Sequence, residues 1–432
     1  MIKSEDSDVR IFNNEPDVAT SPYLQTGFEP QQSEYLSERV LNMYIVGIDI
    51  AKRFHEAAII DRAGKVIVKR IRFANSHVGF LKLMDAVRKL DAPAEFGMEA
   101  TGHYWLPLYA HLRQDGQTVH VINPLQSDAL RNMFLRQTKN DTIDALIVAE
   151  VIRFGRYCET QVAPENIVAL RELCRQRFFI VDMASDLKRK IIALLDQIFP
   201  EYEKLFSDTF GKSSVELLAN YTTPEEMLSV DTQTLADLLQ KTSRGRLGLD
   251  KANEIQQTAK NSFGIMLASS SFSFIIRQYL EQLKQFETSI AAFDQEISRI
   301  MDNFDTKLET ITGVGKTLAA VIFSEIGGDI KKFSSVPKLV AYAGLYPKSR
   351  QSGESKTDGH MSKRGSPYLR RAVWLAATVA AFNDPAISVF YQKKRSEGKD
   401  HLTAIGHVCH KMLAIIFAVL RDNKPYVPAS TS

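Results

Sequence analysis

Tyr44-Ile45-Val46-Gly47-Ile48-Asp49-Ile50 is the stretch on which the fold of this chain depends. It is apolar and rich in β-branched residues, which favours a buried strand. Asp49 is the exception, because a carboxylate in a core strand is costly unless it is paired or binds a metal ion. The stretch therefore predicts a core strand that carries a functional acid.

Three further acids extend this pattern. Glu99 follows a second apolar run, Ala94–Met98, and Asp141 and Asp144 lie three residues apart, so on a helix they share one face. Two such aspartates repel each other, and the simplest alternative is that Lys139 neutralises them or that they are solvated at a helix start. Together with Asp49, however, they indicate four carboxylates converging on a hard cation, Mg²⁺ or Mn²⁺.

Outward from this stretch, the pattern predicts a meander of three strands followed by α/β units. The turn at residues 61–65 suits an antiparallel hairpin between the second and third strands. The expected strands are 44–50, 56–61, 65–72, 94–98 and 118–122, and the expected helices are 76–90 and 104–115.

Length and composition are those of a soluble globular protein. The 432 residues are 44% hydrophobic and 24% charged, enough for two or three domains. The three cysteines, Cys158, Cys174 and Cys409, form no CxxC pair, so neither a zinc site nor a disulfide framework is expected. The sequence shows no apolar run long enough to span a membrane and no signal peptide, so we expect a cytoplasmic protein. Residues 1–43 are polar and acidic and predict a poorly ordered extension.

Positive charge gathers at the end of the chain. The overall charge is +3, but residues 331–432 carry 17 Lys and Arg against 6 Asp and Glu, or +11, which leaves −8 for the rest. Such a block favours contact with nucleic acid over a merely solvated basic face.

Residues 165–300 are expected to be largely helical. Apolar residues recur at threes and fours from Ile167 to Ile198 and again from Ile276 to Ile300, on either side of a polar stretch around 207–262. This predicts an antiparallel helical arm with an insert. Oligomer contact is its favoured use, ahead of nucleic-acid contact through basic residues such as Arg171, Arg175 and Arg177.

Two segments near the end of the chain suit a phosphate backbone. Gly313-Val314-Gly315-Lys316 opens a helix in the manner of a helix-hairpin-helix turn, although it lacks the spacing of a Walker loop. Residues 341–371 predict a loop rich in Gly and Ser between two helices, the second starting at Ser366-Pro367. The basic residues expected to contact nucleic acid are Lys316, Lys348, Arg350, Lys356, Lys363, Arg364, Arg370 and Arg371.

The segments GIDIAK, MEATG, KNDTIDA, TGVGKTLA, AYAGLYP and SKRGSPYLRR resemble, in this order, those of the DEDD transposases of bacterial insertion sequences, the one-ten family. The resemblance implies an α/β plus α architecture. Its parts are a ribonuclease-H-like (RuvC-like) domain at 44–160, a helical coiled-coil arm with an insert at 161–305, and a mainly helical C-terminal transposase domain at 306–425. Residues 1–43 precede this pattern and depart from it, and 426–432 form a tail.

The resemblance also implies the chemistry. Asp49, Glu99, Asp141 and Asp144 would be the four catalytic, metal-binding acids. A C-terminal serine would be the nucleophile, and a structured bridge RNA would pair with donor and target DNA. Ser352, which precedes Gly353, is the favoured serine, and Ser362 is the alternative.

Strand exchange between two duplexes needs several such sites, so a dimer or tetramer is expected in the bacterial cytoplasm, at the nucleoid. Two other interpretations stay open at this point. One is a metal-dependent, structure-selective endonuclease that forms no covalent intermediate, and the other is a nucleic-acid-binding protein without catalysis.

Overall fold

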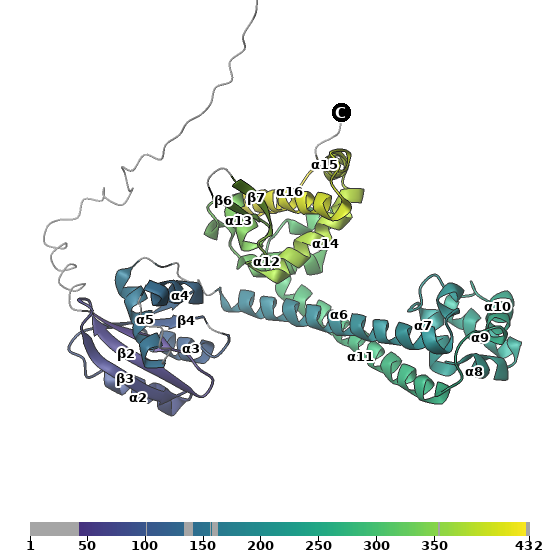
Figure 1. Ribbon diagram of the computed structural model, residues 1–432, viewed down its shortest axis with the longest axis horizontal. Helices are drawn as coiled ribbons and strands as arrows, with labels where there is room; N and C mark the ends of the chain where they lie inside the picture. Colours follow the sequence, from purple (N-terminus) through teal and green to yellow (C-terminus); the bar gives the residue numbers. More distant parts are fainter. Residues whose placement is uncertain are drawn as a thin grey trace, which may run out of the picture. The chain divides into compact units, whose positions relative to one another are not determined.

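The computed structural model describes residues 43–100, 102–133, 141–155, 157, 163–352 and 355–428. The expected extension at 1–43, apart from Met43, lies outside these residues, as do Cys158 and the end of the expected tail. The chain divides into two compact units, one ending at Val162 and the other beginning at Ala163. Each is described by itself (Figure 1).

The first unit is built on a five-stranded mixed sheet with the order β3-β2-β1-β4-β5. Strands β1, β2 and β3 are antiparallel, and β1, β4 and β5 are parallel. The predicted hairpin is confirmed: Asp61 N–H donates to the Lys65 carbonyl at 3.0 Å, and Gly64 takes a φ of 87°. The strands are β1 (Tyr44–Asp49), β2 (Phe54–Asp61), β3 (Val66–Ala74), β4 (Ala94–Glu99) and β5 (Thr118–Ile122).

Helices cover both faces of this sheet. Val46 and Ile48 point into a core shared with α2 (His77–Val87) and α3 (Leu106–Gln114). Ile45 points the other way, into a core shared with α5 (Asp141–Phe154), beside which lies α4 (Pro124–Met133). Side chains alternate between the two faces along β1, and each face packs against helices. The α/β character predicted for this part of the chain is therefore confirmed.

The second unit contains two long helices that pack along each other, α6 (Glu165–Ile198) and α11 (Ser269–Met301) (Figure 1). Arg177 Nε donates to Asp294 Oδ1 at 2.6 Å, which ties the two helices together. The polar insert folds on its own core of Leu217, Leu235 and Ile255. Its elements are the 3₁₀ turn η1 (Tyr202–Leu205) and helices α7 (Lys212–Asn220), α8 (Pro224–Ser229), α9 (Thr232–Ser243) and α10 (Leu249–Lys260).

The end of the chain is mainly helical, as predicted, with one correction. The expected loop between two helices contains an antiparallel hairpin, in which Arg350 pairs with Thr357 and Ser352 with Ser355. The elements are η2 (Leu308–Thr310), α12 (Lys316–Ile326), η3 (Ile330–Lys332), α13 (Val336–Tyr342), β6 (Pro347–Ser352), β7 (Ser355–Met361), α14 (Pro367–Asn383), α15 (Pro385–Ser396) and α16 (His401–Asp422).

Helix α16 is the one single helix in the described part of the chain that is long and apolar enough to cross a membrane. More than half of its apolar window is buried inside the protein. Val408, Met412 and Ile416 are fully buried in the core of this unit. Core helices of soluble proteins share these properties, so α16 is weak evidence for a membrane span.

Candidate active site

Two of the expected acids end neighbouring parallel strands. Asp49 is the last residue of β1 and Glu99 the last of β4, and the register places Ile48 beside Met98. Gly47 and Gly97, two residues earlier in each strand, both lie against α5. Because side chains alternate along a strand, Asp49 and Glu99 also project from the face that α5 covers.

Helix α5 approaches β1 so closely that only glycine fits between them. A Cβ atom on Gly47 would lie 2.1 Å from the Ala145 carbonyl oxygen and 2.4 Å from the Ala149 nitrogen. Asp144 precedes Ala145 and is 6% exposed. The sequence therefore brings a third acid to the sheet face that carries Asp49 and Glu99. Asp141 is the first residue of α5, and its side chain lies outside the described ones.

Glu56 is an acid at this site that the sequence reasoning missed. It pairs across the antiparallel ladder with Asp49 and is 4% exposed. Its carboxylate accepts from Arg70 Nε at 3.0 Å and from Thr142 Oγ1 at 2.9 Å. Arg70 above all, with help from Thr142, lowers the pKa of Glu56. An ionised Glu56 therefore fastens the first turn of α5 to β2. The available signal was the one used for Asp49, an acid within an apolar strand.

The donor set at this face fits a hard divalent ion, since carboxylate oxygens are the ligands that Mg²⁺ and Mn²⁺ prefer. Among the residues that the structure describes, no group of three or more His, Cys, Asp and Glu side chains is placed to hold a metal ion. The carboxylate of Asp141, the fourth expected ligand, falls outside that description. The four acids therefore match a divalent metal ion in the chemistry of their oxygen ligands.

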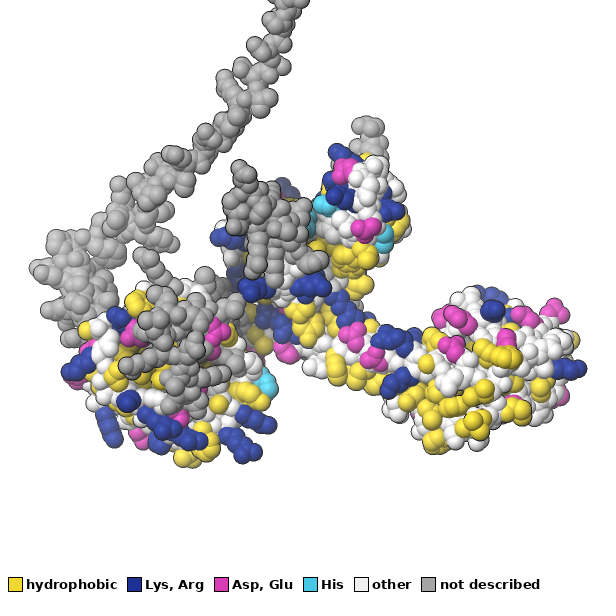
Figure 2. All heavy atoms as spheres, in the orientation of Figure 1, with side chains coloured by type: hydrophobic (Ala, Val, Ile, Leu, Met, Phe, Trp, Pro, Cys, Tyr) yellow, Lys and Arg dark blue, Asp and Glu magenta, His cyan; other side chains and the backbone are white. Residues whose placement is uncertain are grey.

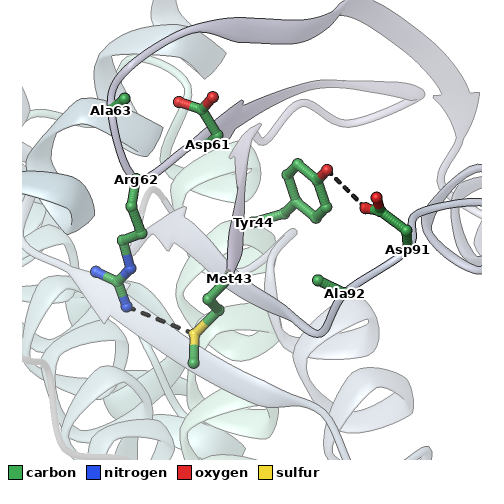
Figure 3. A pocket seen from close by; sticks show the side chains of 7 residues that line it. All are labelled: Met43, Tyr44, Asp61, Arg62, Ala63, Asp91 and Ala92. Carbon is green, nitrogen blue, oxygen red and sulfur yellow. Dashed lines mark hydrogen bonds between the residues drawn. The ribbon is translucent and has the colours of Figure 1, made fainter. Parts of the chain in front are cut away.

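A cavity at the opposite end of β1 has a different character (Figure 3). Its volume is 250 Å³, and Tyr44, Arg62 and Asp91 are among its lining residues. Tyr44 donates to Asp91 at 2.7 Å, which raises the pKa of Tyr44, and Arg62 donates to Glu95 at 3.1 Å. The first pair ties the start of β1 to the segment before β4, and the second ties the turn after β2 to β4.

The favoured serine, Ser352, is the last residue of β6, and its side chain lies outside the described ones. The base of its hairpin is held by backbone hydrogen bonds: Ser362 N–H donates to the Tyr346 carbonyl at 2.8 Å, and Ser366 N–H to the Tyr342 carbonyl at 2.8 Å. Gly365, at a φ of 136°, lies so close that a Cβ atom there would be 2.1 Å from the Tyr342 oxygen. The alternative serine, Ser362, is therefore buried in this base, where its Oγ accepts from Arg364 N–H at 3.4 Å.

A buried carboxylate connects this base to the arm. Glu325 is 1% exposed and accepts from Arg175 Nε at 2.7 Å and from Ser366 Oγ at 2.7 Å. Ser366 also caps α14 by accepting from Leu369 N–H at 3.0 Å. Arg175 further lies over the Tyr368 ring at 4.8 Å. Arg175 was one of the basic residues considered for contact with nucleic acid. In the structure its guanidinium group instead pairs with Glu325 and packs on Tyr368 inside the protein.

The basic residues expected to bind nucleic acid fall into distinct groups. Lys363 and Arg364 are exposed on the loop after β7, and Lys316 is exposed at the first residue of α12, which follows the predicted Gly-x-Gly turn. Arg370 donates to the Ala343 and Lys363 carbonyls, and Arg371 pairs with Asp182 of α6 through two bonds of 2.7 Å. Lys348, Arg350 and Lys356 lie on the hairpin strands, with side chains outside the described ones.

Two family models match this chain. Residues 46–200 match the IS110-type DEDD model described as "Transposase", and residues 305–392 match the "Transposase IS116/IS110/IS902 family".

Several curated proteins are similar over nearly their whole length. The "Insertion element IS900 uncharacterized 42 kDa protein" of Mycobacterium paratuberculosis is 27% identical over 89% of this chain and 98% of its own. The "Insertion element IS116 uncharacterized 44.8 kDa protein" of Streptomyces clavuligerus is 25% identical over 89% and 96%. The "Pilin gene-inverting protein" of Moraxella lacunata is 25% identical over 88% and 97%. With the two transposase models matched in order along it, the chain belongs to the IS110/IS116 family of transposases and site-specific recombinases.

Proposed function

We propose that this transposase excises and inserts a mobile DNA element by serine-mediated strand cleavage and exchange, guided by a structured bridge RNA. The observation that carries the proposal is the placement of Asp49, Glu99 and Asp144. Two of these acids end adjacent strands and project toward α5, and the third lies on α5 where that helix touches β1. The strand order β3-β2-β1-β4-β5 supports a ribonuclease-H-like fold for this domain.

In this proposal the acids, including Asp141, hold Mg²⁺ or Mn²⁺. Such an ion supplies Lewis acidity toward a phosphodiester oxygen. The protein contributes the rigid frame: Gly47 lets α5 reach β1, and Glu56 holds the first turn of α5 through Thr142. Carboxylates gathered on one face repel one another, so cation binding is what makes their full ionisation favourable.

The covalent step is assigned to Ser352. Its Oγ gives up its proton and attacks a DNA phosphorus, the Oγ–P bond forms, the bond from phosphorus to the 3′ oxygen breaks, and the departing 3′ oxygen takes up one proton, so no net proton is lost. Attack by a new 3′-hydroxyl reverses the step and conserves the bond energy. The hairpin base supports this assignment, because it fixes both ends of the segment that carries Ser352 and buries Ser362.

The test is a protein–DNA adduct that survives denaturation. On nicked suicide DNA the wild-type chain should leave a DNA strand attached to the protein, and Ser352→Ala should abolish this adduct while DNA binding persists. Ser362→Ala is the matched control and should retain the adduct at reduced yield. An adduct that depends on Ser362 would reassign the nucleophile. Cleavage without any adduct would favour the structure-selective endonuclease instead.

RNA guidance rests on the +11 charge of residues 331–432 and on the exposed Lys363 and Arg364. Protein purified from cells that carry the flanking non-coding DNA should contain a discrete RNA, and ribonuclease treatment should stop recombination while leaving the protein folded. Recombination that is insensitive to ribonuclease would contradict this part of the proposal.

Assembly into a dimer or tetramer is supported by the arm. Phe263, Met266 and Leu267 precede α11 and are 91%, 72% and 80% exposed, an unusual density of open apolar side chains. Figure 2 shows hydrophobic side chains gathered over this end of the arm. Replacing Met266 and Leu267 with Lys should lower the oligomer mass measured by light scattering. Replacing exposed Lys241 with Glu, in α9, should not.

A further inference from the structure

A second cavity lies at the acid-bearing end of the sheet, on its other face. It has a volume of 220 Å³, and its lining residues include His55, Phe73, His77, Phe80 and His111. Glu56 faces α5 through Thr142, so the preceding residue, His55, faces the side covered by α2 and α3. His55 pairs with Phe73 at the end of β3, next to the end of β1 where Asp49 lies.

His55 presents a hydrogen-bond donor to this cavity. Its Nδ1 accepts from the Ala51 N–H at 3.2 Å, and because an amide can only donate, the proton of the neutral ring is on Nε2. Within the described part of the chain, this buried Nε2 has no hydrogen-bond partner. Burial lowers the pKa of His55, which favours the neutral ring. A weaker hydrogen-bonding effect of the nearby Asn75 side chain raises the pKa, although no bond of normal geometry joins Asn75 to Nε2. A buried donor without a partner is costly, so a ligand acceptor would stabilise it.

His111 presents the complementary acceptor. Its Nδ1 lies 2.9 Å from the Pro107 carbonyl oxygen, and because a carbonyl can only accept, Nδ1 carries a proton, so in the uncharged tautomer Nε2 is an acceptor. Three aromatic rings stand together on this side: the Phe80 and His111 centroids are 5.5 Å apart and those of His77 and His111 6.1 Å apart. The cavity therefore combines ring faces with a donor and an acceptor, which suits a planar heteroaromatic ligand.

Cations surround the same segment. Asn75, which lines the cavity, donates its N–H to the Arg53 carbonyl at 2.9 Å, and the side chains of Lys52 and Arg53 are exposed. Lys82 Nζ donates to the Arg72 carbonyl at 2.7 Å, and both side chains reach solvent. Figure 2 shows Lys and Arg side chains gathered on the part of the first unit that carries β3 and α2. Cations beside a ring-binding cavity match a base attached to its phosphate backbone.

We propose that this cavity holds one unstacked nucleobase of the nucleic-acid strand on which the protein acts. The base stacks among Phe80, His77 and His111, and His55 Nε2–H donates to one of its ring or carbonyl acceptors. The inference rests on the proposed function only in taking nucleic acid as the substrate. It adds a site that holds a base near the acids, on the opposite face of the sheet.

The test is photocrosslinking of the full chain to single-stranded oligonucleotides that each carry one 5-iododeoxyuridine. Irradiation should attach the base to His77, Phe80 or His111, as mapped by mass spectrometry. His77→Ala and His111→Ala, both at exposed positions, should remove most of this crosslink and weaken binding by about tenfold together. Gln114→Ala, an exposed change on the same helix as His111, is the control and should leave crosslinking and affinity unchanged.

The salt dependence of binding separates the base from the backbone. A ring that stacks on a base contacts no phosphate, so the two His variants should lower affinity without changing the slope of log affinity against log salt. Changing Lys52 and Arg53 to Gln should flatten that slope. Crosslinks that map only elsewhere, or that persist in the double His variant, would overturn the proposal. Crosslinking requires no strand cleavage, so failure of the serine mechanism alone would leave this result intact.

Discussion

Gly47→Ala tests whether the contact between α5 and β1 positions the acids. The new Cβ would lie 2.1 Å from the Ala145 oxygen, which is 1.3 Å short of 3.4 Å, where ordinary contact begins. The opposing atoms belong to the backbone of α5 and cannot rotate aside, so the helix itself must retreat by about 1 Å. Overpacking of this kind costs about 1–3 kcal/mol of unfolding free energy. A catalytic group misplaced by about 1 Å can cost about 100-fold in rate, so cleavage by the folded variant should fall by about this factor.

Two glycine variants calibrate this result. Gly97→Ala would meet the Cγ1 atom of the Ile152 side chain at 2.6 Å, and because that side chain can turn, the effect on cleavage should be smaller. Gly116→Ala would meet nothing within 4 Å but sits at a φ of 79°, so it should cost about 1–2 kcal/mol and leave cleavage unchanged.

The measurements are denaturant unfolding and strand cleavage of the element's own donor DNA under conditions where every variant stays folded. A Gly47→Ala protein with wild-type cleavage and stability would refute the close packing of α5 on β1. A Gly116→Ala protein that lost cleavage as strongly as Gly47→Ala would show that stability alone, and not the position of Asp144, controls the reaction.

The remaining predictions concern charges. The folded state lowers the pKa of Glu56, so the ionised carboxylate stabilises the fold above the unfolded pKa of about 4.3, and this stabilisation is lost as pH falls through the lower folded pKa. Glu56→Gln should therefore lower the free energy of unfolding by about 1–3 kcal/mol at pH 7. Denaturant unfolding should also show that the variant loses less stability on acidification. The partly exposed pair of Arg371 and Asp182 should show a coupling energy of about 0.2–1 kcal/mol in a double-mutant cycle, and a larger value would mean that the pair is shielded from solvent. Lys363→Asn, which keeps a residue tolerant of the left-handed backbone, together with Arg364→Gln should reduce the salt slope of nucleic-acid binding by about 1–2, and an unchanged slope would place the phosphate contacts elsewhere.

The α/β part of the fold was predictable because its signals are local. An apolar β-branched run such as Tyr44–Ile50 leaves little alternative to a core strand, and the turn ending at Gly64 specifies a hairpin. That Asp49 and Glu99 each follow a core strand was readable from the sequence, and the structure adds that these two strands are parallel neighbours. The long helices of the arm followed from apolar spacing.

Other features depend on contacts between residues far apart in sequence. The hairpin of Ser352 was predicted as a loop because its strands are polar on both faces and show no alternation; the ladder and the backbone bonds at its base define it. Arg371 was predicted to bind nucleic acid, and sequence alone could not show that Asp182, 189 positions earlier, pairs with it. The same holds for Arg175, whose partner Glu325 is 150 positions away.

The buried Glu325 carboxylate also limits how chimeric transposases could be assembled from relatives. Its partners Arg175 and Ser366 come from the arm and from the start of α14, so three segments separated in sequence share one desolvated charge. A transplanted arm that lacked the arginine would leave this charge buried and uncompensated, at a cost of about 3–5 kcal/mol. The arm and the end of the chain should therefore be transferred together when a chimera is built. The favoured point for joining segments from two family members is the junction before Ala163, which precedes Arg175, Glu325 and Ser366.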